Sequence, residues 1–326
     1  MADSARVFLS GATGFIGRHV LRALRLAGYE VRALVRSPST RIEDAEAVAG
    51  DLRRPGELLQ ALRGCRYLVH CAALYSFAPR DRPTLRSVNV QGTAGLLEAA
   101  RLAGIERAVV TSSGATVGPA RSDGLAATEG QWAVDGADSG YHRSKREQEY
   151  VTLAARVPAV LLLPTTTVGP GDWKPTPTGQ LIADFASGRI FAAAPPGGAN
   201  FVAVEDVAKA HVLALERGRP RQRYLIGGEN LSFEQAWALL ASVTGRPAQR
   251  WPIPYSVAVL MGWIDEARCR VLPQARPRVP LEGVHMSVRR MYVDCSKAKA
   301  ELGYTPGPVR DALARAVEWF RSHGYA

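Results

Sequence analysis

Short apolar runs alternate with helical patterns through the first half of this chain, and that alternation constrains the fold more than any other feature. The runs have the length and composition of strands, and they cover residues 6–10, 30–35, 47–50, 67–70, 108–111 and 159–163. Apolar residues recur at three- and four-residue spacing between them, most clearly over 15–27, 85–103 and 144–155. This rhythm predicts an α/β fold, a doubly wound parallel sheet with helices on both faces.

The chain changes in character after residue 168. Pro/Gly-rich stretches at 169–179 and 195–198 indicate loops. An apolar run at 201–204 leads into a helical pattern at 205–217, and we expect this pair to return to the first sheet as its last unit. Further helices are expected near residues 233–244, 256–270 and 309–323. We therefore expect residues 1–168, joined by 200–219, to form the larger domain, and residues 169–199 and 220–326 to form a smaller, helix-rich substrate lobe.

A glycine-rich turn joins the first strand to the first helix. Glycine permits a tight turn and lets bare backbone approach a pyrophosphate at the N-terminus of a helix. The spacing G-x-x-G-x-x-G differs by one residue from the common dinucleotide-binding pattern. The position of this turn between a strand and a helix is therefore the stronger indication of a dinucleotide site. We expect this turn to bind a dinucleotide through Gly11, Thr13, Gly14, Phe15, Ile16 and Gly17.

The residue that follows the second strand indicates which dinucleotide the chain binds. NAD-binding chains place an acidic residue there for the ribose hydroxyls, whereas this chain has Arg36. An arginine suits a 2′-phosphate, which an aspartate would repel. We therefore expect NADP(H) to be preferred, with NAD(H) possible. The alternative is that Arg36 is one more exposed arginine.

Tyr141 and Lys145 lie four residues apart at the start of a predicted helix, so they share one helix face. Tyrosine is a poor acid or base near neutrality because its pKa is about 10, but a neighbouring ammonium favours the phenolate. Ser113 follows the preceding strand, at the edge where open parallel sheets bind ligands. We expect Ser113, Tyr141 and Lys145 to be catalytic; alternatively, the spacing is a chance match and Ser113 bonds only to local backbone.

In order along the chain, these residues resemble the extended short-chain dehydrogenase/reductases, the NAD-dependent epimerase/dehydratase family, whose nucleotide-binding domain is of the Rossmann type. The resemblance rests on the glycine turn, Asp51-Leu52, Cys71-Ala72-Ala73 and the Asn89–Thr93 stretch N-V-Q-G-T. It implies that Ser113 orients a carbonyl, Tyr141 exchanges a proton, and Lys145 tunes Tyr141 and binds ribose. It also implies a set of further cofactor contacts: Asp51 and Leu52 at the adenine, Ala72 and Ala73 after the fourth strand, and Pro164 and Thr165 by the nicotinamide.

The second half is similar to the subgroup called hopanoid-associated sugar epimerases and to dihydroflavonol 4-reductases. The similarity is carried by residues 174–179, 290–292 and 297–303. Family members often dimerise through two helices, which correspond here to 85–103 and 144–155. The resemblance thus implies a homodimer.

Nucleotide-sugar epimerases hold the substrate diphosphate with arginine and asparagine side chains that this chain lacks. Residues 163–170 read L-P-T-T-T-V-G-P, and residues 281–286 read L-E-G-V-H-M where a second arginine motif would stand. Without fixed cationic donors a diphosphate is poorly held. The same segments carry apolar side chains that suit an apolar pocket, or else simply form core: Leu74, Tyr75, Phe77, Trp173, Ile182, Phe185, Phe191, Trp263 and Met286.

We therefore predict an NADP(H)-dependent oxidoreductase that moves hydride between its cofactor and a carbonyl or secondary alcohol of a mostly apolar small molecule, flavonol-, steroid- or terpenoid-like. One alternative is a sugar or nucleotide-sugar epimerase or dehydratase, in which the hydride returns and the cofactor is not consumed. A second is an NADP-binding sensor without turnover. Intact Ser113, Tyr141 and Lys145 argue against the sensor.

Composition excludes other classes of function. The net charge is +11, but the 41 basic residues are spread without a basic block, so we expect no nucleic-acid partner. The four cysteines have neither paired nor metal-ligand spacing, so no metal site is expected. No apolar stretch of about 18 residues is present and no leader pattern opens the chain, which predicts a cytoplasmic protein without an integral membrane segment.

Overall fold

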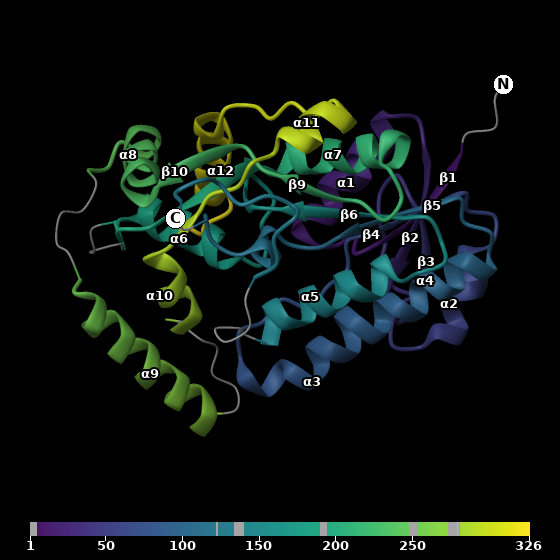
Figure 1. Ribbon diagram of the computed structural model, residues 1–326, viewed down its shortest axis with the longest axis horizontal. Coiled ribbons are helices and arrows are strands. Elements are labelled where there is room, and N and C mark those ends of the chain that lie inside the picture. Colours follow the sequence, from purple (N-terminus) through teal and green to yellow (C-terminus); the bar gives the residue numbers. More distant parts are fainter. Residues whose placement is uncertain are drawn as a thin grey trace.

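The computed structural model describes residues 5–121, 123–133, 140–189, 194–247, 253–272, 279 and 281–326. Its centre is a seven-stranded parallel sheet (Figure 1). From one edge to the other the strands are β3 (Glu46–Ala49), β2 (Glu30–Val35), β1 (Arg6–Ser10), β4 (Tyr67–His70), β5 (Arg107–Thr111), β6 (Ala159–Pro164) and β9 (Arg223–Ile226).

The strands read as continuous apolar runs because both faces of the sheet are covered. Successive side chains alternate between two cores: Leu161 and Leu163 of β6 enter one, and Val160 and Leu162 enter the other. All four are fully buried. Parallel sheets are stable mainly when both faces are dry, and this requirement explains the pattern.

Helices from both halves of the chain cover the two faces (Figure 1). One face packs against α1 (Phe15–Leu26), α7 (Val204–Arg217) and α11 (Ser296–Leu302). The other packs against α2 (Pro55–Leu62), α4 (Gly92–Leu102) and α5 (Gly140–Leu153). The short helix α3 (Arg82–Leu85) continues into α4 through η2 (Arg86–Gln91), a π-helical turn. The predicted doubly wound fold is confirmed.

A second, smaller sheet differs from the sequence expectation. The run expected to close the main sheet instead forms β8 (Gly198–Ala203), which pairs with β7 (Thr166–Val168), β10 (Glu229–Ser232) and β11 (Arg290–Met291). The last strand of the main sheet is β9, although α7 does return to that sheet and pack beside α1. β8 belongs to the small sheet and not to the main one because its side chains Ala199, Phe201 and Ala203 are buried in a third core.

That third core joins the small sheet to three helices. They are α6 (Pro177–Ser187), α8 (Phe233–Thr244) and α12 (Val309–Ser322). α6 starts inside the stretch expected to be a loop, because the Thr176 hydroxyl caps it by accepting a hydrogen bond from the Gly179 amide at 3.1 Å.

Two further helices lie at the edge of the molecule. α9 (Tyr255–Val271) and α10 (Leu281–Ser287) pack on each other, and α9 lies far from the main sheet (Figure 1). None of the helices in the described ranges is both long and apolar enough to cross a membrane.

Candidate active site

The predicted site residues gather along one edge of the main sheet because parallel strands all end there. The connections run from β1 toward β3 in one direction and from β4 toward β9 in the other, so the chain changes direction between β1 and β4. Open α/β sheets bind ligands at such a switch point, outside the carboxyl ends of the strands. The glycine turn follows β1, Ala72 follows β4, and Ser113 follows β5.

The glycine turn is shaped by contacts that only glycine permits. Gly11 has a φ of +84°, and a Cβ there would lie 2.6 Å from the Ala72 backbone nitrogen. A Cβ on Gly17 would lie 1.9 Å from the Gly11 carbonyl oxygen. The turn therefore has room for backbone alone, with Ala72 directly behind it.

The start of α1 fits the pyrophosphate of a dinucleotide. Gly14 caps the helix without a side-chain hydrogen bond, and the first turn holds no acidic residue. Its free N–H groups and the positive end of the helix dipole favour an anion. Thr13 and Gly14 are exposed, whereas Phe15 and Ile16 are half-buried. These residues would hold the diphosphate of a nicotinamide dinucleotide.

The adenosine end of the expected cofactor site carries two arginines. Arg36 follows β2, is exposed, and makes no ion pair with any other described residue. Arg53 pairs with both carboxylate oxygens of Asp51 and holds the pKa of that carboxyl down, at about 2. Leu52 is buried against Gly92, where an added Cβ would meet it at 3.0 Å. Arg53 was not singled out from the sequence, although it stands only two residues after Asp51.

Tyr141 and Ser113 are brought together by α5 and the end of β5. The Tyr141 side chain is buried, and burial raises the pKa of its phenol; a hydrogen bond with Ser113 lowers that pKa and the nearby Glu282 carboxylate raises it. Ser113 also accepts a hydrogen bond from the Ala115 amide at 3.3 Å, so local capping accompanies the contact to Tyr141. The balance keeps the phenol protonated at neutral pH, ready to donate.

Lys145 is buried one helical turn beyond Tyr141. Its ammonium donates to the Thr111 carbonyl oxygen at 2.8 Å and to Gln148 Oε1 at 2.7 Å. Desolvation lowers the pKa of Lys145 to about 8, against the opposing effect of the Glu149 carboxylate. The lysine thus carries its charge at neutral pH in a dry environment, where a charge acts strongly on its neighbours.

A chain of buried hydrogen bonds links Lys145 to the base of the glycine turn. Gln148 Nε2 donates to Thr93 Oγ1 at 2.9 Å, His70 Nε2 lies 2.8 Å from the same hydroxyl, and His70 Nδ1 lies 2.6 Å from Ser10 Oγ. Burial lowers the pKa of His70 to about 3, so this histidine is neutral. Sequence reasoning did not single out Ser10, His70 or Gln148.

Asn89 lies in the π-helical turn η2 and is fully buried. Its side chain accepts from the Leu74 amide at 2.8 Å, donates to the Leu74 carbonyl at 3.0 Å, and donates to Ser144 Oγ at 2.9 Å. It therefore fixes the segment after β4 against the helix that carries Tyr141.

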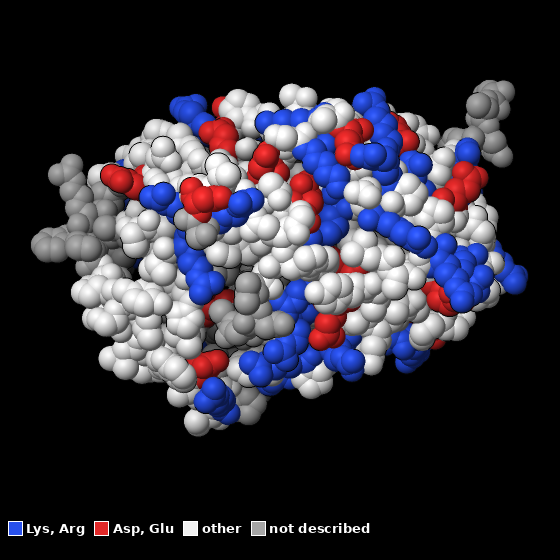
Figure 2. Space-filling model, in the orientation of Figure 1, with Lys and Arg blue, Asp and Glu red and all other residues white. Residues whose placement is uncertain are grey.

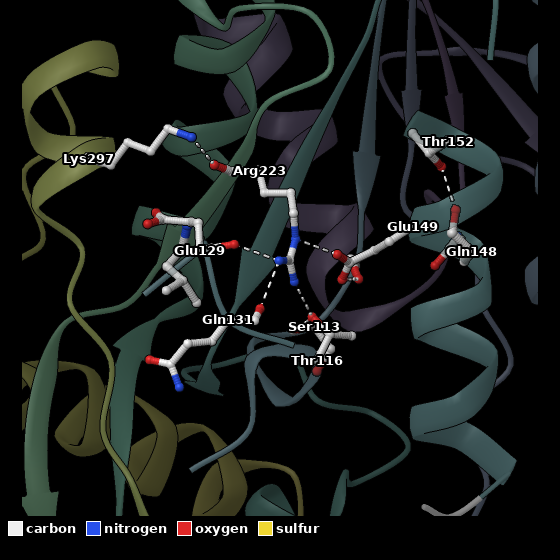
Figure 3. A network of polar contacts seen from close by, with 11 residues as sticks. Ser113, Thr116, Glu129, Gln131, Gln148, Glu149, Thr152, Arg223 and Lys297 are labelled. Carbon is white, nitrogen blue, oxygen red and sulfur yellow. Dashed lines mark hydrogen bonds and ion pairs between the residues drawn. The ribbon is translucent and has the colours of Figure 1, made fainter. Parts of the chain in front are cut away.

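A buried ion pair supports the back of the site. Arg223 Nε lies 2.7 Å from Glu149 Oε2, and both side chains are almost fully buried. Glu149 also accepts a hydrogen bond from Ser112, while the guanidinium donates to the carbonyl oxygens of Glu129 and Gln131. Figure 3 shows these groups converging on Arg223, with Ser113 beside them. The pair joins α5, β9 and the segment before residue 133 behind Ser113.

Comparisons with known proteins identify the family of this chain. The model of the NAD dependent epimerase/dehydratase family matches residues 7–227. The chain belongs to this family. Members of it are NAD(P)-dependent, and the expected resemblance to extended short-chain dehydrogenase/reductases is confirmed.

Individual relatives indicate to which members of the family this chain is similar. A Synechocystis protein provisionally named dihydroflavonol 4-reductase is 41% identical over 338 residues, which covers 100% of this chain and 96% of the relative. Sterol demethylase protein B of Methylococcus capsulatus is 35% identical over 329 residues, covering 97% and 98%. The crystal structure of gox2253 is similar with a TM-score of 0.85 and 38% identity, covering 99% of both chains. The chain is thus an enzyme of the NAD-dependent epimerase/dehydratase family, and it is dihydroflavonol reductase-like within that family.

The apolar residues expected near the substrate fall into different places. Tyr75 and Phe77 pack around Tyr141, with ring centroids 4.5 Å and 6.0 Å from its ring. Ile182 and Phe185 are instead buried in the third core, so they do not line the site. The other five lie as follows: Trp173 contacts Trp319 and His323, Trp263 is exposed on α9, Leu74 and Met286 are half-buried, and Phe191 lies outside the described residues.

The two residues that the resemblance implied by the nicotinamide, Pro164 and Thr165, lie beside the Ser113 loop. A Cβ added to Gly114 would meet Thr165 Cγ2 at 3.1 Å and the Pro164 carbonyl oxygen at 3.3 Å. Thr165 is fixed in turn, since its hydroxyl donates to Asn200 Oδ1 at 2.8 Å. The end of β6 therefore lies directly against η3 (Gly114–Val117).

The burial of Lys145 predicts a pH-dependent stability. Because its pKa falls from 10.5 to about 8 on folding, the unfolded chain binds more protons between these values. The free energy of unfolding of the wild type should therefore rise, relative to Lys145→Met, by about 3 kcal/mol from pH 8 to pH 10.5. Denaturant unfolding of both proteins across this range measures the difference. Lys174→Met, which removes an exposed lysine, should give a curve parallel to wild type; a parallel curve for Lys145→Met would contradict the assignment.

Proposed function

We propose that this enzyme transfers hydride between NADP(H) and a carbonyl or secondary alcohol of a mostly apolar, polycyclic substrate. The observation that carries the proposal is the environment of Tyr141. The phenol is buried between aromatic rings and a serine hydroxyl, one helical turn from a buried ammonium. A protonated phenol in apolar surroundings suits donation of a proton to a ketone oxygen.

In the reductive direction, each polar side chain has one role. Ser113 donates a hydrogen bond to the substrate carbonyl oxygen and orients it. Tyr141 gives its phenolic proton to that oxygen as the carbon gains hydride, and the Lys145 ammonium stabilises the tyrosinate that remains. Bound NADPH supplies the hydride, and oxidation of the alcohol runs through the same groups in reverse.

The charge near Tyr141 favours an apolar substrate over a sugar nucleotide. Glu282 of α10 stands in the region where nucleotide-sugar epimerases have their second arginine motif, and it pairs with His142 beside Tyr141. A carboxylate there would repel a diphosphate. The relative named sterol demethylase protein B supports the same substrate class. The rings of Tyr75 and Phe77 would contact such a polycyclic skeleton.

A direct assay tests this activity. Wild-type enzyme should consume NADPH stoichiometrically with a polycyclic ketone from a panel of steroid, terpenoid and flavonoid carbonyls, measured by NADPH absorbance. Tyr141→Phe should lower kcat by roughly 10²- to 10⁴-fold while NADPH still binds, because only proton transfer is lost. Tyr29→Phe, which alters a tyrosine packed on Tyr67 instead, is the matched control.

Two results would refute the proposed activity. Conversion of a sugar nucleotide without NADPH consumption would identify an epimerase instead. Binding of NADPH with neither reaction would identify a sensor. Full activity of Tyr141→Phe in whichever assay responds would overturn the mechanism.

We further propose that Arg36 selects NADP(H) by pairing with the 2′-phosphate. It is exposed at the carboxyl end of β2 and unpaired within the described chain. Arg36→Ala should weaken NADP⁺ binding by roughly 10- to 100-fold, since hydrogen bonds to charged groups contribute about 1.5–3 kcal/mol, and leave NAD⁺ binding unchanged. Calorimetric titration measures both. Arg22→Ala, which removes an exposed arginine of α1, should change neither affinity; an unchanged preference in Arg36→Ala would leave Arg53 as the candidate.

A further inference from the structure

Helix α9 exposes an unusual concentration of large apolar side chains. Nine of the sixteen large hydrophobic residues that the described chain exposes lie between positions 253 and 272. They are Ile253, Tyr255, Val257, Leu260, Met261, Trp263, Ile264, Val271 and Leu272, each between 44% and 77% exposed. A patch of this kind on an otherwise polar surface marks an interaction site.

The pattern around α9 is the reverse of that of an ordinary surface helix. The buried positions Gly262, Asp265 and Cys269 lie on one face, and at 100° per residue Leu260 and Ile264 lie on the opposite face. A polar carboxylate therefore points inward, where Asp265 accepts from Arg268 and from the Val279 amide. Ordinary surface helices turn their charged residues outward. Figure 2 shows the corresponding surface, at the lower left, almost free of charged residues.

The chemistry of the surrounding chain identifies the occupant. In the sequence, the segment 246–290 that includes α9 has eight arginines and three acidic residues, a net charge of +5. Five of these arginines belong to the described residues: Arg246, Arg268, Arg270, Arg289 and Arg290. Basic side chains also border the apolar surface in Figure 2. Trp263 and Tyr255 are exposed among the aliphatic residues, and these two residue types favour the boundary between lipid and water. An apolar helix face with aromatic side chains and a basic surround complements an anionic bilayer surface.

The length of the helix decides between lying on a membrane and crossing it. α9 has 17 residues, which gives a length of about 25 Å at about 1.5 Å per residue, less than the roughly 30 Å of a hydrocarbon core. We propose that α9 is a docking helix that lies in the interface of an anionic lipid bilayer, with the face of Leu260 and Ile264 toward the acyl chains.

The docking helix contacts α10, and α10 in turn contacts the candidate active site. α10 packs on α9 through Leu281, which a Cβ on Gly262 would meet at 3.0 Å. The next residue, Glu282, pairs with His142 beside Tyr141. A membrane-bound α9 would therefore hold α10 and the Glu282–His142 pair close to the lipid. Docking itself is independent of the proposed function, because it depends only on the surface of α9.

Vesicle flotation of the full chain tests the docking. Wild type should float with vesicles of phosphatidylcholine and phosphatidylglycerol, and less with phosphatidylcholine alone or at high salt. The double variant Leu260→Asn, Ile264→Asn should bind at least about tenfold more weakly, because it removes two inserting side chains. The matched control Leu26→Asn, Leu125→Asn alters two leucines elsewhere that are at least as exposed, and it should float like wild type. An unchanged far-ultraviolet circular dichroism spectrum and melting temperature verify the fold of every variant, whether or not it binds NADPH.

Three outcomes would overturn the proposal. Wild type could stay unbound with both vesicle compositions, or the α9 double variant could float as well as wild type. Alternatively, light scattering could reveal a dimer that the α9 double variant abolishes while no protein floats, in which case the helix face binds a second copy of this chain instead of lipid.

Discussion

The ammonium of Lys145, held in a dry interior by the Thr111 carbonyl and Gln148, is the constraint on which the candidate site depends. Keeping a charge there costs stability, as the lowered pKa of Lys145 indicates. What the fold gains is a fixed cation one turn from Tyr141. Because Thr111 ends β5, the same bond fixes α5 against the edge of the sheet where the glycine turn lies.

Buried polar groups around this lysine make the arrangement specific. The chain through Gln148, Thr93 and His70 reaches Ser10, directly before the glycine turn, so the proposed cofactor and catalytic regions share one network. On the opposite side, the Glu149–Arg223 pair fixes the backbone behind Ser113. A buried pair of this kind adds little net stability, but removing one partner leaves an uncompensated charge, so we interpret it as a positioning element.

Most of the main sheet could be predicted from the sequence because its strands follow from local patterns. The structure places Ser113 and the glycine turn at one edge of that sheet, while the roles of these residues stay predictions. Short, mostly apolar runs between turn signals favour buried strands, and β1, β2 and β4 begin and end where the runs do. The buried hydrogen-bond network could not be predicted. Ser10 and His70 are 60 residues apart, and no local sequence pattern links them. β9 was missed because four residues beginning with Arg223 carry too weak a pattern, and Ile182 and Phe185 looked equally suited to core or pocket until the third core was seen.

The ionisation of Tyr141 reports whether phenol, ammonium and cofactor form one site. An ultraviolet difference titration of wild type against Tyr141→Phe isolates this phenol from the other nine tyrosines. NADP⁺ should lower the pKa of Tyr141, because the oxidised nicotinamide adds a positive charge beside it. The shift should be present in wild type and smaller in Lys145→Met. If Tyr141 ionises at the same pH with and without NADP⁺, the phenol and the cofactor do not share one site.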